Sequence, residues 1–163
     1  MEVARDARFY GGGVFRGIAL EAPEVEGGSD SSLEFFRSEV RWGKILSAKP
    51  RRLWIEQSHF SVTLLEELDP GSVWIDHSVF KEVDFTRVNF RLGQIGLSTF
   101  SRVNFREVNL SKARFVRCEF FDCQFAECDF QDTTFKQCFF RDCTTPGSRP
   151  ETSWTIDCQG ELK

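Results

Sequence analysis

Apolar residues recur at every fifth position of this chain, and this spacing constrains its fold more than any other feature. The series runs from residue 35 to residue 140, and 20 of its 22 positions are Phe, Ile, Leu or Val; the exceptions are Pro50 and Pro70. Thirteen of the 18 Phe residues lie in it. A period of five fits neither an α-helix nor an extended strand. It predicts a chain that turns a corner every five residues.

The residue two positions before each apolar centre is uncharged throughout the series, and it is small from Val73 onward. We therefore expect two of every five side chains to point inward. A longer repeat supports this interpretation, because segments 54–60 and 74–80 carry Trp, Ile, Ser and Phe at matching positions. Four corners of five residues close one square coil, so residues 20 apart should stack on successive coils.

Several five-residue units combine a small apolar residue, then Asp or Asn, then Phe or Leu. This pattern resembles the pentapeptide-repeat family, and the resemblance is strong from Val73 to Cys143. It implies that family's fold, an all-β, right-handed quadrilateral parallel β-helix with about 20 residues per coil. The units that match best begin at Val83, Val88, Val103 and Val108.

The expected core is a set of apolar ladders, in which each inward side chain stacks on the residue of the next coil. Parallel strands on successive coils lie about 4.8 Å apart. Burial of one Phe is worth roughly 1.5–3 kcal/mol, so the ladders need neither a disulfide nor a metal to hold the fold. The Phe residues expected in them are Phe80, Phe85, Phe90, Phe100, Phe105, Phe115, Phe120, Phe125, Phe130, Phe135 and Phe140.

Three regions are expected along the chain. Residues 1–12 form an N-terminal segment, residues 13–143 form the β-helix with degenerate coils at 13–70 and regular coils at 71–143, and residues 144–163 form a C-terminal cap or tail. Trp154 and Ile156 are expected to fold back over the last coil. In some members of the family that end makes a two-fold dimer instead, so the resemblance leaves a homodimer open.

Length, charge and hydropathy exclude several classes of protein. A chain of 163 residues has room for one domain. A formal net charge of −4 argues against direct nucleic-acid binding. No apolar run is long enough for a transmembrane helix, and the N-terminus lacks the apolar stretch of a signal peptide. We expect a cytoplasmic protein that binds neither nucleic acid nor a membrane.

Cysteine and histidine suggest no catalytic or metal chemistry. Five cysteines occupy the inward small position, where consecutive ones lie on different sides of the square, so zinc ligation is not expected. Only Cys158 lies outside this pattern, as the one candidate reactive thiol. Ser58 should point inward and His59 outward, which prevents a catalytic pair. We expect no cofactor, no metal and no enzyme. The five inward cysteines are Cys118, Cys123, Cys128, Cys138 and Cys143.

The outward positions carry the candidate partner-binding residues. Trp54 and Trp74 stack in one exposed column. Residues 119–132, near the C-terminal coils, include five acidic residues and no basic one. The acidic residues are Glu119, Asp122, Glu127, Asp129 and Asp132.

The resemblance also suggests a function. The best-known role in the family is protection of DNA gyrase and topoisomerase IV from inhibitors by proteins that resemble DNA in width and charge. A DNA mimic that binds a type II topoisomerase is therefore the leading hypothesis. Two alternatives stay open: an assembly adaptor that binds a protein through an apolar, Trp-bearing face, and a domain of a secreted effector.

Overall fold

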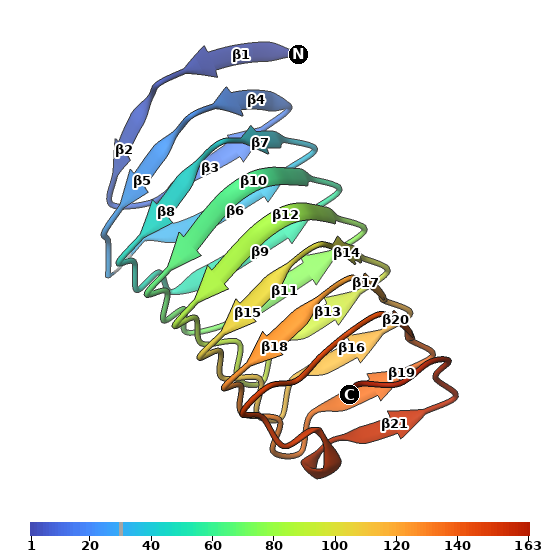
Figure 1. Ribbon diagram of the computed structural model, residues 1–163. Helices are drawn as coiled ribbons and strands as arrows, with labels where there is room; N and C mark the ends of the chain where they lie inside the picture. Colours follow the sequence, from blue (N-terminus) through green and yellow to red (C-terminus); the bar gives the residue numbers. More distant parts are fainter. Residues whose placement is uncertain (30) are drawn as a thin grey trace.

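The computed structural model, which describes residues 1–29 and 31–163, is a tower of stacked coils (Figure 1). All strand pairs are parallel, and most join residues 20 apart, such as Phe60 with Phe80 and Phe80 with Phe100. The chain is therefore the predicted right-handed quadrilateral parallel β-helix. The described residues contain no α-helix, and the only helical turn among them is the 3-10 helix η1 (Pro150–Thr152).

We number the four sides of the tower as face 1 to face 4, in the order in which the chain visits them. Face 1 is an eight-stranded sheet. Its strands are β3 (Gly13–Arg16), β6 (Ser32–Phe36), β9 (Arg52–Glu56), β11 (Val73–Asp76), β13 (Gln94–Gly96), β16 (Arg114–Val116), β19 (Thr134–Lys136) and β21 (Trp154–Ile156).

Faces 2 and 3 belong to a second sheet, and the described residues of face 4 form only isolated bridges, such as Asn89 with Asn109. Face 2 contains β1 (Glu2–Arg5), β4 (Ile18–Glu21), β7 (Glu39–Arg41), β14 (Thr99–Ser101), β17 (Glu119–Phe121) and β20 (Phe139–Arg141). Face 3 contains β2 (Arg8–Tyr10), β5 (Glu24–Glu26), β8 (Lys44–Leu46), β15 (Asn104–Arg106) and β18 (Gln124–Ala126). Strands β10 (His59–Glu66) and β12 (Val79–Thr86) run across both faces.

Ladders of Phe rings fill the interior. The eleven Phe residues expected in the core are all buried, and none is more than 3% exposed. On face 2 the rings of Phe80, Phe100 and Phe120 stack with 5.0 Å between the centroids of successive rings. Stacked aromatic pairs add roughly 0.5–1.5 kcal/mol each beyond the burial of their area. The five-residue repeat thus produces a continuous core in which each coil contacts only the coils next to it.

The corners of the square use the left-handed backbone region. The residue two positions after each apolar centre has a positive φ along most of the tower, as at Leu97 (47°), Arg117 (53°) and Glu127 (56°). Residues other than glycine rarely adopt this region. Its regular recurrence turns the chain by one face every five residues, and it keeps the corner side chains outside.

The first coil is four residues shorter than the others. Val3 pairs with Ala19, and Phe9 pairs with Val25, so this coil has 16 residues. The glycines at 11–13 form the tight turn that shortens it, with φ of +97° at Gly12. A Cβ atom on Gly28 would lie 2.6 Å from the main chain of Gly11. Only glycine permits this close approach.

The coils extend beyond both expected boundaries of the β-helix. At the N-terminus, β1 and β2 pair with β4 and β5, so residues 2–10 are a coil rather than a separate segment. At the C-terminus, β21 pairs with β19 and sets Trp154 beside Thr134. Ser148 and Cys158 keep the inward small position there, since the Ser148 hydroxyl donates to the Phe125 carbonyl (2.7 Å). The tail is therefore one more coil.

The expectation that Trp154 and Ile156 fold back as a cap is wrong. Because β21 keeps the 20-residue register, both side chains point outward, and Trp154 is 64% exposed. The main chain of the last coil covers the core instead. The Phe140 N–H donates to the Gln159 carbonyl (2.8 Å), and a Cβ on Gly160 would lie 1.8 Å from the Phe140 carbonyl oxygen. The main chain at Gly160, with Cys158 and Leu162 packed against the core, closes this end of the tower in place of tryptophan.

Candidate protein-binding face

Face 1 collects the exposed apolar side chains of the protein. Thirteen large apolar side chains are exposed among the described residues, and six of them lie on face 1 or at its corner with face 2. A flat sheet that exposes several large apolar side chains among charged ones is typical of a protein interface. The six residues are Val14, Trp74, Leu97, Val116, Trp154 and Ile156.

The predicted tryptophan column lies on this face, near the middle of the tower. Trp54 on β9 pairs in register with Trp74 on β11, and their ring centroids are 6.1 Å apart. Phe36 on β6 extends the cluster, 5.7 Å from Trp54. Trp54 is half-buried, because the Arg52 guanidinium lies over its ring at 4.9 Å. Trp74 is the more accessible of the two, with 45% of its surface exposed.

An ion pair between a buried carboxylate and a partly exposed arginine stabilises the end of this cluster nearest the N-terminal coils. The Glu34 side chain points outward from β6, yet the residue is only 5% exposed. Arg52 covers it and donates from Nε to Glu34 Oε1 at 3.0 Å, with a second bond from Nη2. The same arginine therefore neutralises a buried carboxylate and packs against Trp54. This double contact holds the aromatic cluster in a fixed position.

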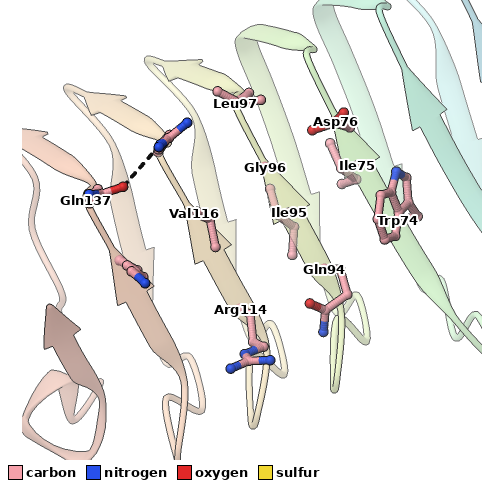
Figure 2. A pocket seen from close by; sticks show the side chains of 12 residues that line it. Trp74, Ile75, Asp76, Gln94, Ile95, Gly96, Leu97, Arg114, Val116 and Gln137 are labelled. Atoms are coloured by element: carbon pink, nitrogen blue, oxygen red, sulfur yellow. Dashed lines mark hydrogen bonds between the residues drawn. The ribbon is translucent and has the colours of Figure 1, made fainter.

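A hollow of about 360 Å³ opens beside Trp74, on the side of the C-terminal coils (left of Trp74 in Figure 2). Its centre is Gly96 on β13, which has no side chain to fill the gap between Asp76 on the coil above and Val116 on the coil below. Leu97 forms one apolar wall. The hollow therefore has an apolar floor and is open to solvent.

Charge is distributed unevenly around the hollow. Arg114, Arg117 and Lys136 line its lower part, towards the C-terminal coils. Within the part of the chain that the structure describes, no carboxylate lies within 4.0 Å of these three cations. Asp76 lies at the upper end, where its Oδ2 is 2.7 Å from Nδ1 of His77. The charge around the hollow thus changes from negative on the N-terminal side to positive on the C-terminal side.

The predicted acidic residues do not form one surface. All five are exposed, but Glu119 and Asp122 lie on face 2 and its corner, while Asp129 lies on face 4. Glu127 and Asp132 are corner residues with positive φ on either side of face 4. A run of acids in the sequence winds around the square, because the chain changes face every five residues. Adjacent acids in the sequence are therefore a poor guide to a charged face.

An excess of acid does gather on face 3, where the sequence analysis did not place it. The face and its corner with face 4 have seven acids and four bases. Arg87 on the corner pairs with Glu66 (2.5 Å) and Glu67 (3.1 Å), and the Ser47 hydroxyl, together with this guanidinium, lowers the pKa of Glu67. The acids are Glu24, Glu26, Glu66, Glu67, Asp84, Glu107 and Glu127, and the bases are Arg8, Lys44, Arg87 and Arg106.

Sequence reasoning missed two features of face 1. Trp154 lies in the same column as Trp54 and Trp74, and its spacing of 80 residues from Trp74 is a multiple of 20 that could have shown this. Gly96 was missed for another reason. A glycine at an outward position predicts a hollow only when its neighbours on the preceding and following coils are known.

The Asp-His-Ser sequence at residues 76–78 is not a catalytic triad. The Ser78 hydroxyl points into the core and donates to the Asp76 carbonyl oxygen at 2.8 Å, while His77 is exposed on the corner. Ser78 Oγ in turn accepts a bond from the Ser58 N–H (3.2 Å). The serine therefore belongs to a ladder of inward hydroxyls that ties successive coils together.

The inward cysteines continue this serine ladder. The Cys138 thiol bonds to the carbonyls of Phe115 and Lys136, each at 3.5 Å, as the serine hydroxyls do on earlier coils. Burial raises the pKa of Cys128 to about 12.

Among residues 1–29 and 31–163, no three His, Cys, Asp or Glu side chains are grouped so that they could hold a metal ion. In the same ranges no helix is long and apolar enough to cross a membrane.

Comparison with known proteins agrees with the repeat and the fold. Residues 98–142 match the family model of pentapeptide repeats in eight copies. No curated protein matches the sequence at a significant level.

Solved structures match almost the whole chain at low sequence identity. HetL, a pentapeptide repeat protein involved in heterocyst differentiation regulation from the cyanobacterium Nostoc sp. strain PCC 7120, is 7% identical, covers 94% of this chain and 86% of its own, and has a TM-score of 0.56. A trypsin-treated form of QnrB1, a plasmid-mediated fluoroquinolone resistance protein, is 14% identical, covers 96% and 81%, and has a TM-score of 0.56. At such identities the likeness shows the fold alone. Residues 98–142 thus carry pentapeptide repeats, and the chain as a whole shares the fold of these two repeat proteins.

Proposed function

We propose that this protein is a non-enzymatic binding protein that recognises a partner protein through face 1. The observation that carries the proposal is the alignment of Trp54, Trp74 and Trp154 on one sheet face, with exposed Leu97 and Val116 between them. Exposed apolar residues on a surface rimmed by charge are typical of interfaces. Tryptophan is also among the residues that most often dominate binding energy.

The rigidity of the face supports the same function. Every strand of face 1 pairs with the strand of the next coil, so the exposed side chains stand at fixed intervals. A surface that is already ordered loses little conformational entropy on binding. Such a face suits an adaptor that holds a partner in one orientation.

The test is a comparison of two variants in binding to a purified partner, first captured from the native organism and identified. We expect Trp54→Ala with Trp74→Ala to weaken binding by about tenfold or more, as the loss of a hot spot does. Trp42→Ala is the matched control, because Trp42 is exposed (57%) on the far side of face 2. Equal binding by the double variant and the wild type would refute the proposal.

A second candidate function is binding to a type II topoisomerase in place of DNA. It is favoured by the excess of acid on face 3 and by the family role that the sequence resemblance suggests. The candidate predicts salt-sensitive binding to gyrase that competes with DNA. Glu107→Lys with Glu127→Lys on face 3 should weaken this binding more than Asp122→Lys with Asp129→Lys. A protein that changes neither gyrase supercoiling nor its inhibition by drugs does not have this function.

A further inference from the structure

We infer that the partner segment on face 1 inserts one apolar side chain into the hollow at Gly96 and places acidic residues beside Arg114, Arg117 and Lys136, on one side of that anchor only. This inference rests on the proposed binding through face 1 and names the chemistry of the partner. It depends on three observations: the missing side chain at position 96, the apolar walls of the hollow, and the charges at its two ends.

Gly96 is not required by the backbone. It lies within β13, its φ is not positive, and its carbonyl accepts a bond from the His77 N–H (3.2 Å) like other strand residues. A Cβ there would approach only one group closely, the end of the flexible Asp76 side chain at 2.8 Å. Glycine is unfavourable inside a strand, and it often marks a place where another molecule comes close. Its effect here is to leave the hollow open.

The walls of the hollow suit an aliphatic or aromatic side chain. The Trp74 ring bounds it from above, Leu97 and Val116 bound it from the side and below, and all three are exposed (45%, 45% and 38%). A volume of about 360 Å³ lies at the small end of the range for ligand pockets, so it accommodates one large side chain. An anchor that fills such a pocket dominates the affinity of an interface.

The charges give the partner segment a direction. Below the anchor, Arg114 is exposed, and Arg117 donates from Nε to Gln137 Oε1 at 3.1 Å, which leaves its two terminal nitrogens free for a carboxylate (Figure 2). Above the anchor, Asp76 and Glu56 repel acidic residues. Complementary charge fixes the register of a bound segment, and like charge excludes the reversed register. Acids should therefore flank the anchor on one side.

The experiment selects phage-displayed random linear peptides on the immobilised protein. We expect enrichment of peptides with one Leu, Ile, Phe or Trp and a cluster of Asp or Glu consistently on the same side of it. The synthetic consensus peptide should bind about tenfold more weakly to Gly96→Leu, which fills the hollow, and to Arg114→Glu with Lys136→Glu. High salt should also weaken its binding to the wild type.

A matched control separates local from global effects of charge. Lys81→Glu with Arg106→Glu changes the net charge equally but lies on faces 2 and 3, and it should leave the binding unchanged. The inference would be overturned if this control weakened binding equally, or if the consensus peptide bound Gly96→Leu as well as the wild type. It would also be overturned if the selected peptides lacked acidic residues or carried them on both sides of the anchor. If a natural partner still needs Trp54 and Trp74 after such a result, the proposed function stands and only the anchor and its acids are refuted.

Discussion

The rings of Phe105 and Phe125 lie parallel, with 4.5 Å between their centroids and 1° between their planes. They are 20 residues apart in sequence and adjacent in the face 3 ladder, where Phe85 stacks on the other side of Phe105 at 5.2 Å. Neither ring touches water, since both are 0% exposed. The stability of each coil therefore depends on the aromatic residue of the coil beside it.

Phe105→Asp should unfold the protein. The substitution removes a ring that two neighbours stack on, and it buries a carboxylate with no partner. The measurement is thermal unfolding followed by circular dichroism. Phe105→Leu is the control, which should fold with a lower melting temperature because it leaves a cavity but no charge. An unchanged melting temperature for Phe105→Asp would contradict the assignment of the inward face.

Two glycine substitutions should have opposite effects. Gly96→Val should stabilise the protein by up to about 1 kcal/mol, because valine favours a strand and the one group that a Cβ would approach closely, the end of the flexible Asp76 side chain at 2.8 Å, can move aside. Gly160→Ala should destabilise it, because Gly160 has a φ of +79° and the new Cβ would collide with the Phe140 carbonyl. Denaturant titration of both variants measures the difference. A Gly96→Val protein that is much less stable than the wild type would show that the backbone needs this glycine.

Arg52→Ala should cost about 1 kcal/mol of unfolding free energy, because it removes the hydrogen-bond donors of the Glu34 carboxylate and the cation over the Trp54 ring. The effect is small because Arg52 is partly exposed and its removal lets water reach Glu34. Replacing both residues, as Arg52→Leu with Glu34→Leu, should restore most of the loss. The comparison uses the midpoints of urea unfolding. A double variant that is less stable than Arg52→Ala would refute this account of the pair.

Thiol titration of the native protein should find no more than one fast-reacting cysteine, Cys158. Burial raises the pKa of this thiol, but it is the only one of the six that is not fully buried. Cys143 is 2% exposed and its thiol donates to the carbonyls of Phe120 and Arg141 (3.5 and 3.4 Å), so reagents reach it only when the last coil opens. Cys158→Ser should therefore abolish the fast reaction. Several fast-reacting thiols in that variant would contradict the burial of the ladder.

The binding surface that we propose on face 1 was only partly visible in the sequence. Trp54 and Trp74 could be predicted as neighbours, because residues 20 apart share a column whatever the details of packing. The hollow at Gly96 could not, since a gap is defined by the side chains of Asp76 and Val116 around it. Arg114, Arg117 and Lys136 likewise come together only across two coils.

The five-residue period was enough to predict the fold, because a square β-helix is the geometry that buries every apolar centre. It was also enough to predict which Phe residues form the core. The positions at which surface charges meet depend on the packed coils, since a chain that turns every five residues distributes the run from Glu119 to Asp132 over different sides. The ending of the tower depends on the packed coils as well. Hydrogen bonds to the preceding coil hold the last coil in register. Trp154 therefore faces solvent, although two apolar residues in a polar tail suggested a cap.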